Sequence, residues 1–247
     1  MNKTERDQMY QDSLDFIRDC KKHQHLQYAK TNIDFEKLDA ASAFDYVQNK
    51  SNWPSLKIHV DFPLQDIQKE VSDASDLWVT HRSFESDGWE SMCIHGQSLE
   101  HTEGYNEELG DYHWTELAQR CPITVKWLKE DWAFRSYDRV RFMKLKPGGF
   151  IKPHQDHPQR KLTAFNISIF EPAEGHEFGM EQANIIPWKE GDIRLIDIGR
   201  KHSLVNHGSE DRIHMIIHGR YGPSTTKNIV NSFRIEQEKL LLDKLYH

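Results

Sequence analysis

The feature that most constrains this chain is a series of short strand-like segments between Arg139 and Arg220. Their sequences are RVRFMKL, KLTAFNISIF, DIRLIDI and RIHMIIHGR, and apolar and polar residues nearly alternate in each. Turn-forming sequences such as KPGG, PAEG and KEGD separate them. Short strands with turns at this spacing are typical of antiparallel sandwiches and barrels, whereas a parallel sheet needs a helix between its strands. The sequence therefore predicts a mainly β protein with a jelly-roll or barrel core.

Helices and further strands are predicted around this core. The predicted helices cover residues 4–22, 34–48 and 113–131 and the chain after residue 223. Additional strands are predicted at residues 56–62, 77–84 and 86–96. Thr4 can cap the first helix, and Pro122 can begin a helix within the third helical segment. The helices at the two ends of the chain are expected to support the β core.

The chain contains no internal repeat and no low-complexity linker, so we do not divide it into independent domains. We expect residues 1–50 to form a helical extension packed on the core, residues 51–222 to form the β domain, and residues 223–247 to form a C-terminal helix. The residues expected to face the core from that last helix are Phe233, Leu240, Leu241 and Leu245.

Composition excludes several classes of function. The net charge of −7 and the pI near 6.1 argue against a nucleic-acid groove, which requires clustered Lys and Arg. No apolar run has the length of a membrane span, and the charged start lacks the apolar stretch of a secretory signal. Cys20, Cys93 and Cys121 are scattered and have no Cys-x-x-Cys spacing, which favours reduced thiols and a cytoplasmic location.

A candidate metal site lies in the sequence KPHQDHP, which follows a strand and the Pro-Gly-Gly turn. In an extended segment, residues two apart point to the same side, so His154 and Asp156 can reach one ion. His202, just after the strand DIRLIDI, is the candidate third ligand, and His207 is its competitor. Two histidines and one carboxylate leave three octahedral positions open, which suits iron(II) and oxygen chemistry, whereas structural zinc fills all four of its positions.

The His-x-Asp triplet alone has no predictive value. Chance supplies about one such triplet in a chain with 15 histidines, and a second one is present at His59-Val60-Asp61. Only the triplet that begins at His154 is followed by a histidine next to a strand and by an arginine about ten residues later. We therefore interpret His59 and Asp61 as a surface or edge-strand pair.

That arginine, Arg212, begins the apolar strand RIHMIIHGR. A charge inside an apolar strand is costly unless it is paired. A planar guanidinium can hold a carboxylate through two parallel hydrogen bonds, which suits the distal carboxylate of an oxo acid. The alternative is a buried ion pair, with Asp197 as a possible partner. Beside the two histidines and the aspartate, we favour the oxo acid.

The stretch from Arg139 to Gly222 resembles the aspartyl/asparaginyl β-hydroxylase family of 2-oxoglutarate oxygenases and the related bacterial proline hydroxylases. The residues that carry the resemblance are RFMKLKPGGFIKPH ending at His154, WKEGDIRLIDIGRKH ending at His202, and HSLVNHGSEDR ending at Arg212. The resemblance implies a double-stranded β-helix, iron at His154 and His202, and 2-oxoglutarate at Arg212. Animal aspartyl hydroxylases have glycine where this chain has Asp156, whereas the proline hydroxylases keep the aspartate.

The resemblance also suggests further residues around the cosubstrate. Ala164 and Asn166 stand where members often have an Arg-x-His, so Asn166 is expected near the oxo-acid carboxylate. Met143 is expected to line the same pocket. Arg141 shares its strand face and is either a grip for a substrate carboxylate or a surface salt bridge. His214 shares a face with Arg212 and is either a supporting residue or a core histidine.

The predicted function is thus an iron(II)- and 2-oxoglutarate-dependent dioxygenase that uses O2 to hydroxylate an amino acid or a peptide side chain. Asp156 favours hydroxylation over halogenation, because halogenases of this type leave that position to chloride. Residues 81–105 are aromatic enough to form a wall over the site. Two alternatives stay open: a cupin-like metal-dependent isomerase or epimerase, and a non-catalytic binding protein stabilised by its metal.

Overall fold

The strand-like segments form one curled antiparallel sheet in the computed structural model, which describes residues 2–23, 28, 33–82, 84, 86–101 and 104–245. The strands are β1 (Ser55–Ile58), β2 (Val79–Thr80), β3 (Ser86–Gly96), β4 (His113–Trp114), β5 (Ser136–His154), β6 (Leu162–Phe170), β7 (His176–Met180), β8 (Asn184–Ile185), β9 (Ile193–Asp197), β10 (His202–Asn206) and β11 (Arg212–Arg220). Hydrogen-bonded neighbours follow the order β1-β9-β6-β11-β5-β10-β7-β8, and β3 pairs with β2, β4 and β5. The predicted mainly β, jelly-roll core is confirmed.

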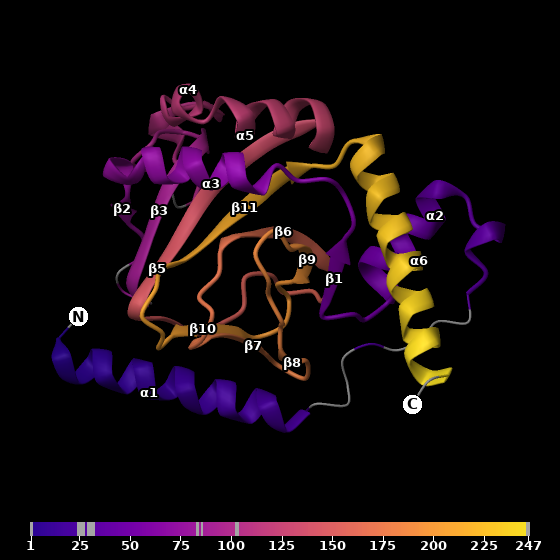
Figure 1. Cartoon of the computed structure of the whole chain (residues 1–247), viewed down its shortest axis with the longest axis horizontal. Coiled ribbons are helices and arrows are strands. Elements are labelled where there is room, and N and C mark those ends of the chain that lie inside the picture. The colour runs from indigo at the N-terminus through magenta and orange to yellow at the C-terminus, as the bar shows by residue number, and fades with distance from the viewer. Residues whose placement is uncertain are drawn as a thin grey trace.

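β5 joins the two halves of the curled sheet (Figure 1). Its first half pairs with β11, where Leu145 faces Arg212, and its second half pairs with β10. Between the halves, Gly148 has a φ of 72°, and a Cβ on Gly149 would lie 2.8 Å from a backbone oxygen. Other residues rarely fit such positions. The Pro-Gly-Gly sequence therefore lies within one long strand instead of ending it.

Six α-helices among the described residues flank this sheet: α1 (Lys3–Cys20), α2 (Ala40–Asp45), α3 (Leu64–Asp73), α4 (Leu117–Arg120), α5 (Pro122–Trp127) and α6 (Pro223–Leu245). α1 runs alongside β10 and β7, whereas α3 to α5 lie across the opposite side of the molecule, near β3 and β11 (Figure 1). None of the described helices combines the length and apolar composition required to span a bilayer.

Buried apolar residues fix the two terminal helices to the sheet. On α1, Ile17 packs against Phe150 and Val205 in a small cluster of its own. On α6, Phe233 is fully buried, and its ring centroid lies 4.5 Å from that of Trp53. Leu240 also packs against the main core, whereas the side chains of Leu241 and Leu245, which belong to the predicted stripe, lie outside the described residues.

Some predicted boundaries are wrong. Asn2, not Thr4, caps α1: its side chain accepts a hydrogen bond from the backbone N–H of Glu5, and the Glu5 side chain accepts one in return. The strand predicted at 77–84 is reduced to the two residues of β2. Arg82 has a φ of 43°, a left-handed conformation that ends an extended strand.

Two predicted helices are shorter than expected. Within 34–48 the α-helix is limited to α2, which begins after its N-cap Asp39 and continues as a π-helical turn, Tyr46–Lys50. Within 113–131 the first residues pair with β3 as β4, so helix begins at Leu117. Pro122 is the first residue of α5, as predicted.

Candidate functional site

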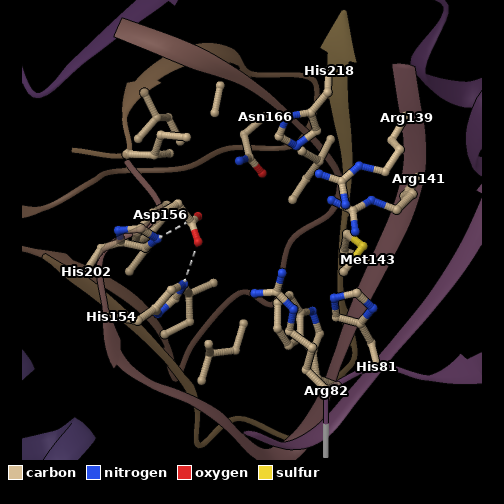
Figure 2. Close-up of a pocket in the computed structure, with 18 of the residues that line it drawn as sticks. His81, Arg82, Arg139, Arg141, Met143, His154, Asp156, Asn166, His202 and His218 are labelled. Atoms are coloured by element: carbon tan, nitrogen blue, oxygen red, sulfur yellow. Dashed lines mark ion pairs between the residues drawn. The ribbon is translucent and has the colours of Figure 1, made fainter. Parts of the chain in front are cut away.

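The candidate metal ligands meet where β5 and β10 pair. His154 and His202 are direct cross-strand partners, and their ring centroids lie 4.3 Å apart. Asp156 follows two residues after the end of β5, and its carboxylate oxygens lie 3.6 Å from His154 Nε2 and 3.7 Å from His202 Nε2. One ligand atom from each residue lies within 4.8 Å of the others. Figure 2 shows the three side chains converging at one side of the pocket. The three candidate ligands predicted from the sequence therefore lie close enough together to hold one metal ion.

Hydrogen bonds to the backbone orient both imidazoles. The Nδ1 of His154 donates to the carbonyl of Lys152, and the Nδ1 of His202 donates to the carbonyl of Arg200, each at 2.9 Å. With the proton on Nδ1, the lone pair is on Nε2, which is the atom that faces Asp156. Burial is the main cause that lowers the pKa of His202, to about 4, so this imidazole is neutral and able to bind a metal at neutral pH.

The turn that carries Asp156 is fixed to the turn after β9. The backbone N–H of Asp156 donates to the carbonyl of Ile198 at 3.1 Å, and the side-chain amide of Gln155 donates to the carbonyl of Gly199 at 2.8 Å. Asp197 forms a buried ion pair with Arg200 at 3.0 Å. Asp197 therefore holds this turn in place and is not the partner of Arg212 that the sequence left open.

The donor set fits a catalytic iron(II) ion. It offers two imidazole nitrogens and one carboxylate, and no fourth His, Cys, Asp or Glu joins the group within the described part of the chain. Three protein ligands on one face leave room for an oxo acid and dioxygen, whereas a structural zinc site is closed by four. All three residues line the pocket, and the side chain of Asp156 is 39% exposed.

Arg212 lies in the same pocket and is almost completely buried, with 3% of its surface exposed. One guanidinium N–H donates to His214 Nδ1 at 2.6 Å, and Nε has no hydrogen-bond partner among the described residues. Burial lowers the pKa of Arg212 to about 10, so it stays charged at neutral pH. A buried charged donor with an unused N–H is what an incoming carboxylate would satisfy.

A buried network supports Arg212 from behind. His214, which accepts from Arg212, donates through Nε2 to Glu171 at 2.7 Å, and Glu171 also contacts His176 and accepts from Ser168. The pKa of Glu171 is held well below its usual range: burial would raise it, but the hydrogen bonds from His176 and His214 outweigh that effect. His214 is thus a supporting residue for the arginine, the first of the two roles predicted for it.

The cavity that these residues line has a volume of about 320 Å³. Met143 and Asn166 line it as predicted, and so does Ala164. Asn166 Oδ1 also lies 3.3 Å from His214 Nδ1. Arg141 is 6% exposed and points into the cavity, so the alternative of a surface salt bridge is wrong (Figure 2). Among the described residues, the lining consists of His81, Arg82, Trp89, Arg139, Arg141, Met143, Ile151, His154, Asp156, Ala164, Asn166, Phe178, Ile196, Ile198, His202, Leu204, Arg212, Ile216 and His218.

Sequence reasoning missed several lining residues. Strand alternation could have predicted Arg139 and His218 as lining residues, because each lies an even number of residues from a predicted site residue on the same strand. Arg82 belongs to the predicted wall at 81–105, but nothing in the sequence singled it out, since it lies in a loop before β3. Within the predicted wall at 81–105, Trp89 lines the cavity, but His95 packs on Trp114 and Tyr105 is 54% exposed away from the lining.

The other histidines and the aspartate considered as metal ligands lie away from the metal cluster. His59 Nε2 is 2.7 Å from a carboxylate oxygen of Glu236 on α6, so this histidine fixes the C-terminal helix. Asp61 is exposed, and His207 is exposed at the end of β10. None of the three lines the cavity that holds the cluster of His154, Asp156 and His202.

Comparison with known proteins gives one family match. The sequence model of the aspartyl/asparaginyl β-hydroxylase family matches residues 52–220. No curated protein sequence matches the chain. Among solved structures, a prolyl-4-hydroxylase from Pseudomonas putida is 12% identical, with 74% of this chain and 99% of that chain covered and a TM-score of 0.45. A 2OG-Fe(II) oxygenase family oxidoreductase from Burkholderia pseudomallei is 10% identical, with 79% and 99% covered and a TM-score of 0.47.

Proposed function

The chain belongs to the aspartyl/asparaginyl β-hydroxylase family, and on this premise we propose that His154, Asp156 and His202 hold its iron and that Arg212 holds its 2-oxoglutarate. The chain is a 2-oxoglutarate-dependent non-haem iron dioxygenase that hydroxylates an amino acid or a peptide side chain. Iron(II) is its cofactor, and 2-oxoglutarate and O2 are its cosubstrates. The family decides against the isomerase and the non-catalytic scaffold.

The observation that carries the assignment is the shared cavity. Three ligand atoms within 4.8 Å and a buried guanidinium with an unused N–H line one space of about 320 Å³. Iron(II) and 2-oxoglutarate supply the oxygen chemistry when bound: one atom of O2 enters succinate, the other becomes the new hydroxyl group, and CO2 is released.

The protein contributes position and charge. His154 and His202 present Nε2 because the backbone holds their Nδ1 protons, and Asp156 supplies the negative ligand. Arg212 is positioned to receive the distal carboxylate through two parallel hydrogen bonds. The apolar side chains of Met143, Phe178 and others around the cavity limit the access of water to the reacting atoms.

We also propose a cytoplasmic location. Cys20, Cys93 and Cys121 are all free and buried. Burial raises the pKa of Cys20 and Cys121 to about 12, which keeps both as unreactive thiols. Free thiols in this number are typical of a reducing compartment.

The test is succinate formation by the purified protein with iron(II), ascorbate and 2-oxoglutarate. We expect His202→Ala and Asp156→Asn to abolish both turnover and the rise in thermal midpoint caused by iron(II). The matched controls His207→Ala and Asp61→Asn replace exposed residues of the same types outside the cavity and should behave like wild type. Equal turnover in His202→Ala and His207→Ala would show that the metal is held elsewhere.

A further inference from the structure

The helix α1 lies outside the segment that the family model matches. The model covers residues 52–220, whereas α1 comprises Lys3–Cys20. The helix nevertheless lies along β5, β10, β7 and β8 (Figure 1). Two of these strands, β5 and β10, carry His154 and His202. An addition in this place can affect the catalytic cavity, and its contacts at each end indicate how.

The C-terminal end of α1 packs beside the strand that carries His202. Ile17 is 1% exposed and lies so close to Gly179 of β7 that a Cβ on this glycine would be 2.9 Å from Ile17 Cγ1. Gly179 is the cross-strand neighbour of Ser203, which directly follows His202. Close apolar packing therefore fixes this end of the helix to the strands of the metal site.

The N-terminal end of α1 is joined to the start of β3 by Arg6. Its Nε donates to a carboxylate oxygen of Asp87 at 2.5 Å, and a terminal N–H donates to the carbonyl of Gly148 in β5 at 3.3 Å. The guanidinium carbon also lies 5.9 Å from the centroid of the Phe150 ring. Asp87 and Phe150 are cross-strand partners, so Arg6 contacts β3 and β5 at the point where they pair.

The start of β3 has little freedom at this point. Gly88 has a φ of 66°, and a Cβ on it would lie 3.1 Å from the Cα of Gly149 in β5. The register between β3 and β5 shifts from Asp87 to Trp89, as it does at a β-bulge. Because a bulge redirects the side chain beside it, the position of Asp87 affects the direction in which Trp89 points.

Trp89 belongs to one wall of the cavity, which we call the β3 wall and which consists of His81, Arg82 and Trp89. The backbone N–H of His81 donates to the carbonyl of Trp89 at 2.9 Å, and the centroids of their rings lie 4.3 Å apart. The hydroxyl of the buried Ser86 donates to the carbonyl of Arg82 at 2.8 Å. His81 and Arg82 lie across the cavity from the metal ligands (Figure 2). The β3 wall is therefore held as one unit to the start of β3.

We infer that α1 is part of the substrate-binding machinery of this chain and that Arg6 is its positioning residue. Arg6 fixes the β3 wall through Asp87, and Ile17 fixes the same helix to the strands of His154 and His202. One helix thereby sets the position of the β3 wall relative to the metal. The inference rests on the proposed function, which places iron and 2-oxoglutarate at the other walls and leaves the β3 wall to the substrate.

The cosubstrate should not depend on this helix. Arg212 is supported by His214 of β11 and by Glu171, which directly follows β6, whereas α1 lies along β5, β10, β7 and β8. Loss of Arg6 should therefore act on substrate binding and leave 2-oxoglutarate in place. The side chains of Arg6 and Asp87 are 37% and 43% exposed, so we expect an effect of moderate size.

The experiment compares Arg6→Gln and Asp87→Asn with wild type. Arg6→Lys keeps the charge without the planar set of donors and should recover part of the effect. Arg18→Gln is the matched arginine control, because Arg18 lies on the same helix but pairs with Asp15 one turn earlier. Ile229→Val shortens a fully buried side chain of α6 and controls for a general loss of stability.

Two measurements locate the effect. Backbone hydrogen exchange is followed across residues 79–94 in the intact protein with iron(II) and 2-oxoglutarate, without oxygen. Succinate formation is measured with L-aspartate, L-asparagine and L-proline, each free and blocked at its amino and α-carboxyl groups, and KM is determined for the most active compound. In Arg6→Gln and Asp87→Asn we expect faster exchange and a substrate KM about three- to ten-fold higher, with kcat and the KM for 2-oxoglutarate within about two-fold of wild type. Both controls should match wild type in these measurements.

The outcomes separate this inference from the proposed function. Exchange across residues 79–94 that is unchanged in Arg6→Gln, or that rises as much in Ile229→Val, overturns the positioning role. A substrate KM equal to that of Arg18→Gln, or a KM for 2-oxoglutarate that rises by the same factor, overturns it as well, while turnover by the wild type stands. If none of these compounds is a substrate, the exchange result alone decides. A wild-type protein that makes no succinate and is not stabilised by 2-oxoglutarate removes the proposed function, and this inference with it.

Discussion

Replacing Arg212 by methionine tests how the cosubstrate is held. The change removes the charge and the hydrogen-bond donors but keeps an unbranched side chain of similar length in a position that is 3% exposed. Two parallel charge-assisted hydrogen bonds contribute about 1.5–3 kcal/mol each, and water or neighbouring polar groups recover part of that. A net loss of about 3–4 kcal/mol corresponds to a rise of roughly 10²- to 10³-fold in KM for 2-oxoglutarate.

The assay is succinate formation over a range of 2-oxoglutarate concentrations, with Arg220→Met as the matched control. Arg220 lies at the exposed end of the same strand and outside the cavity. Arg212→Lys should give an intermediate KM, because it restores the charge without the planar pair of donors. KM should change far more than kcat, since this contact is present before and during the reaction. A KM for 2-oxoglutarate in Arg212→Met within about three-fold of the Arg220→Met value would refute this role.

Three further predictions concern the supporting structure. Glu171→Gln removes the carboxylate that anchors His214, so we expect KM for 2-oxoglutarate to rise about ten-fold with kcat less affected, and an unchanged KM would leave Glu171 with a purely structural role. The pKa of His218 is lowered to about 3 in the folded protein by burial and by the nearby arginines, whereas an unfolded histidine titrates near 6.5. The unfolded state therefore binds the extra proton, so this part of the stability is complete above pH 6.5 and is lost as the pH falls below it, by about 1.4 kcal/mol per pH unit. Urea unfolding of wild type and His218→Gln between pH 7.5 and 5 should show the smaller slope in the variant, and parallel slopes would contradict a neutral, half-buried His218. Gly149→Ala should lower the free energy of unfolding by about 2 kcal/mol or more, because its Cβ would lie 2.8 Å from a backbone oxygen, whereas Gly148→Ala meets no atom within 4 Å and should cost only the strain of its positive φ, about 1 kcal/mol. Equal losses in the two variants, measured by urea unfolding, would show that close contact is not the reason for the glycine.

The sequence predicted best those features of the fold and the site that depend on a single strand or on one pair of strands. Alternation predicted β5, β6, β9 and β11, and parity along β5 correctly paired Arg141 with Met143 on one face. The spacing of His154, Asp156 and His202 predicted that they meet, because the two histidines stand at ends of neighbouring strands. These features lie within one strand or between two paired strands, and the alternation of apolar and polar residues is enough to predict them.

Other parts of the site depend on contacts that no local pattern encodes. Arg82 lines the cavity from a loop and itself has a left-handed backbone conformation, which nothing in the neighbouring sequence predicts. Glu171 reaches His214 across 43 positions of sequence and His176 across a turn, so its role follows only from how β6, β7 and β11 stack. The strand predicted at 77–84 is wrong for a similar reason: Leu77 ends a 3-10 helix, Leu77 and Trp78 pack against the main core, and only Val79 and Thr80 pair with β3.

β5 explains why Arg212 and the candidate metal ligands can share one cavity. Its register with β11 places Leu145 opposite Arg212, and its register with β10 places His154 opposite His202. Because side chains alternate along a strand, a slip of one residue in either half would turn that half's functional residues away from the cavity. The bend at the two glycines permits each half to keep its own partner strand and its own register. Arg141 and His154 therefore belong to one strand but to separate pairings, because Arg141 lies opposite Ile216 of β11 and His154 lies opposite His202 of β10. A substitution of the Arg141 side chain should thus leave the pairing that positions His154 intact.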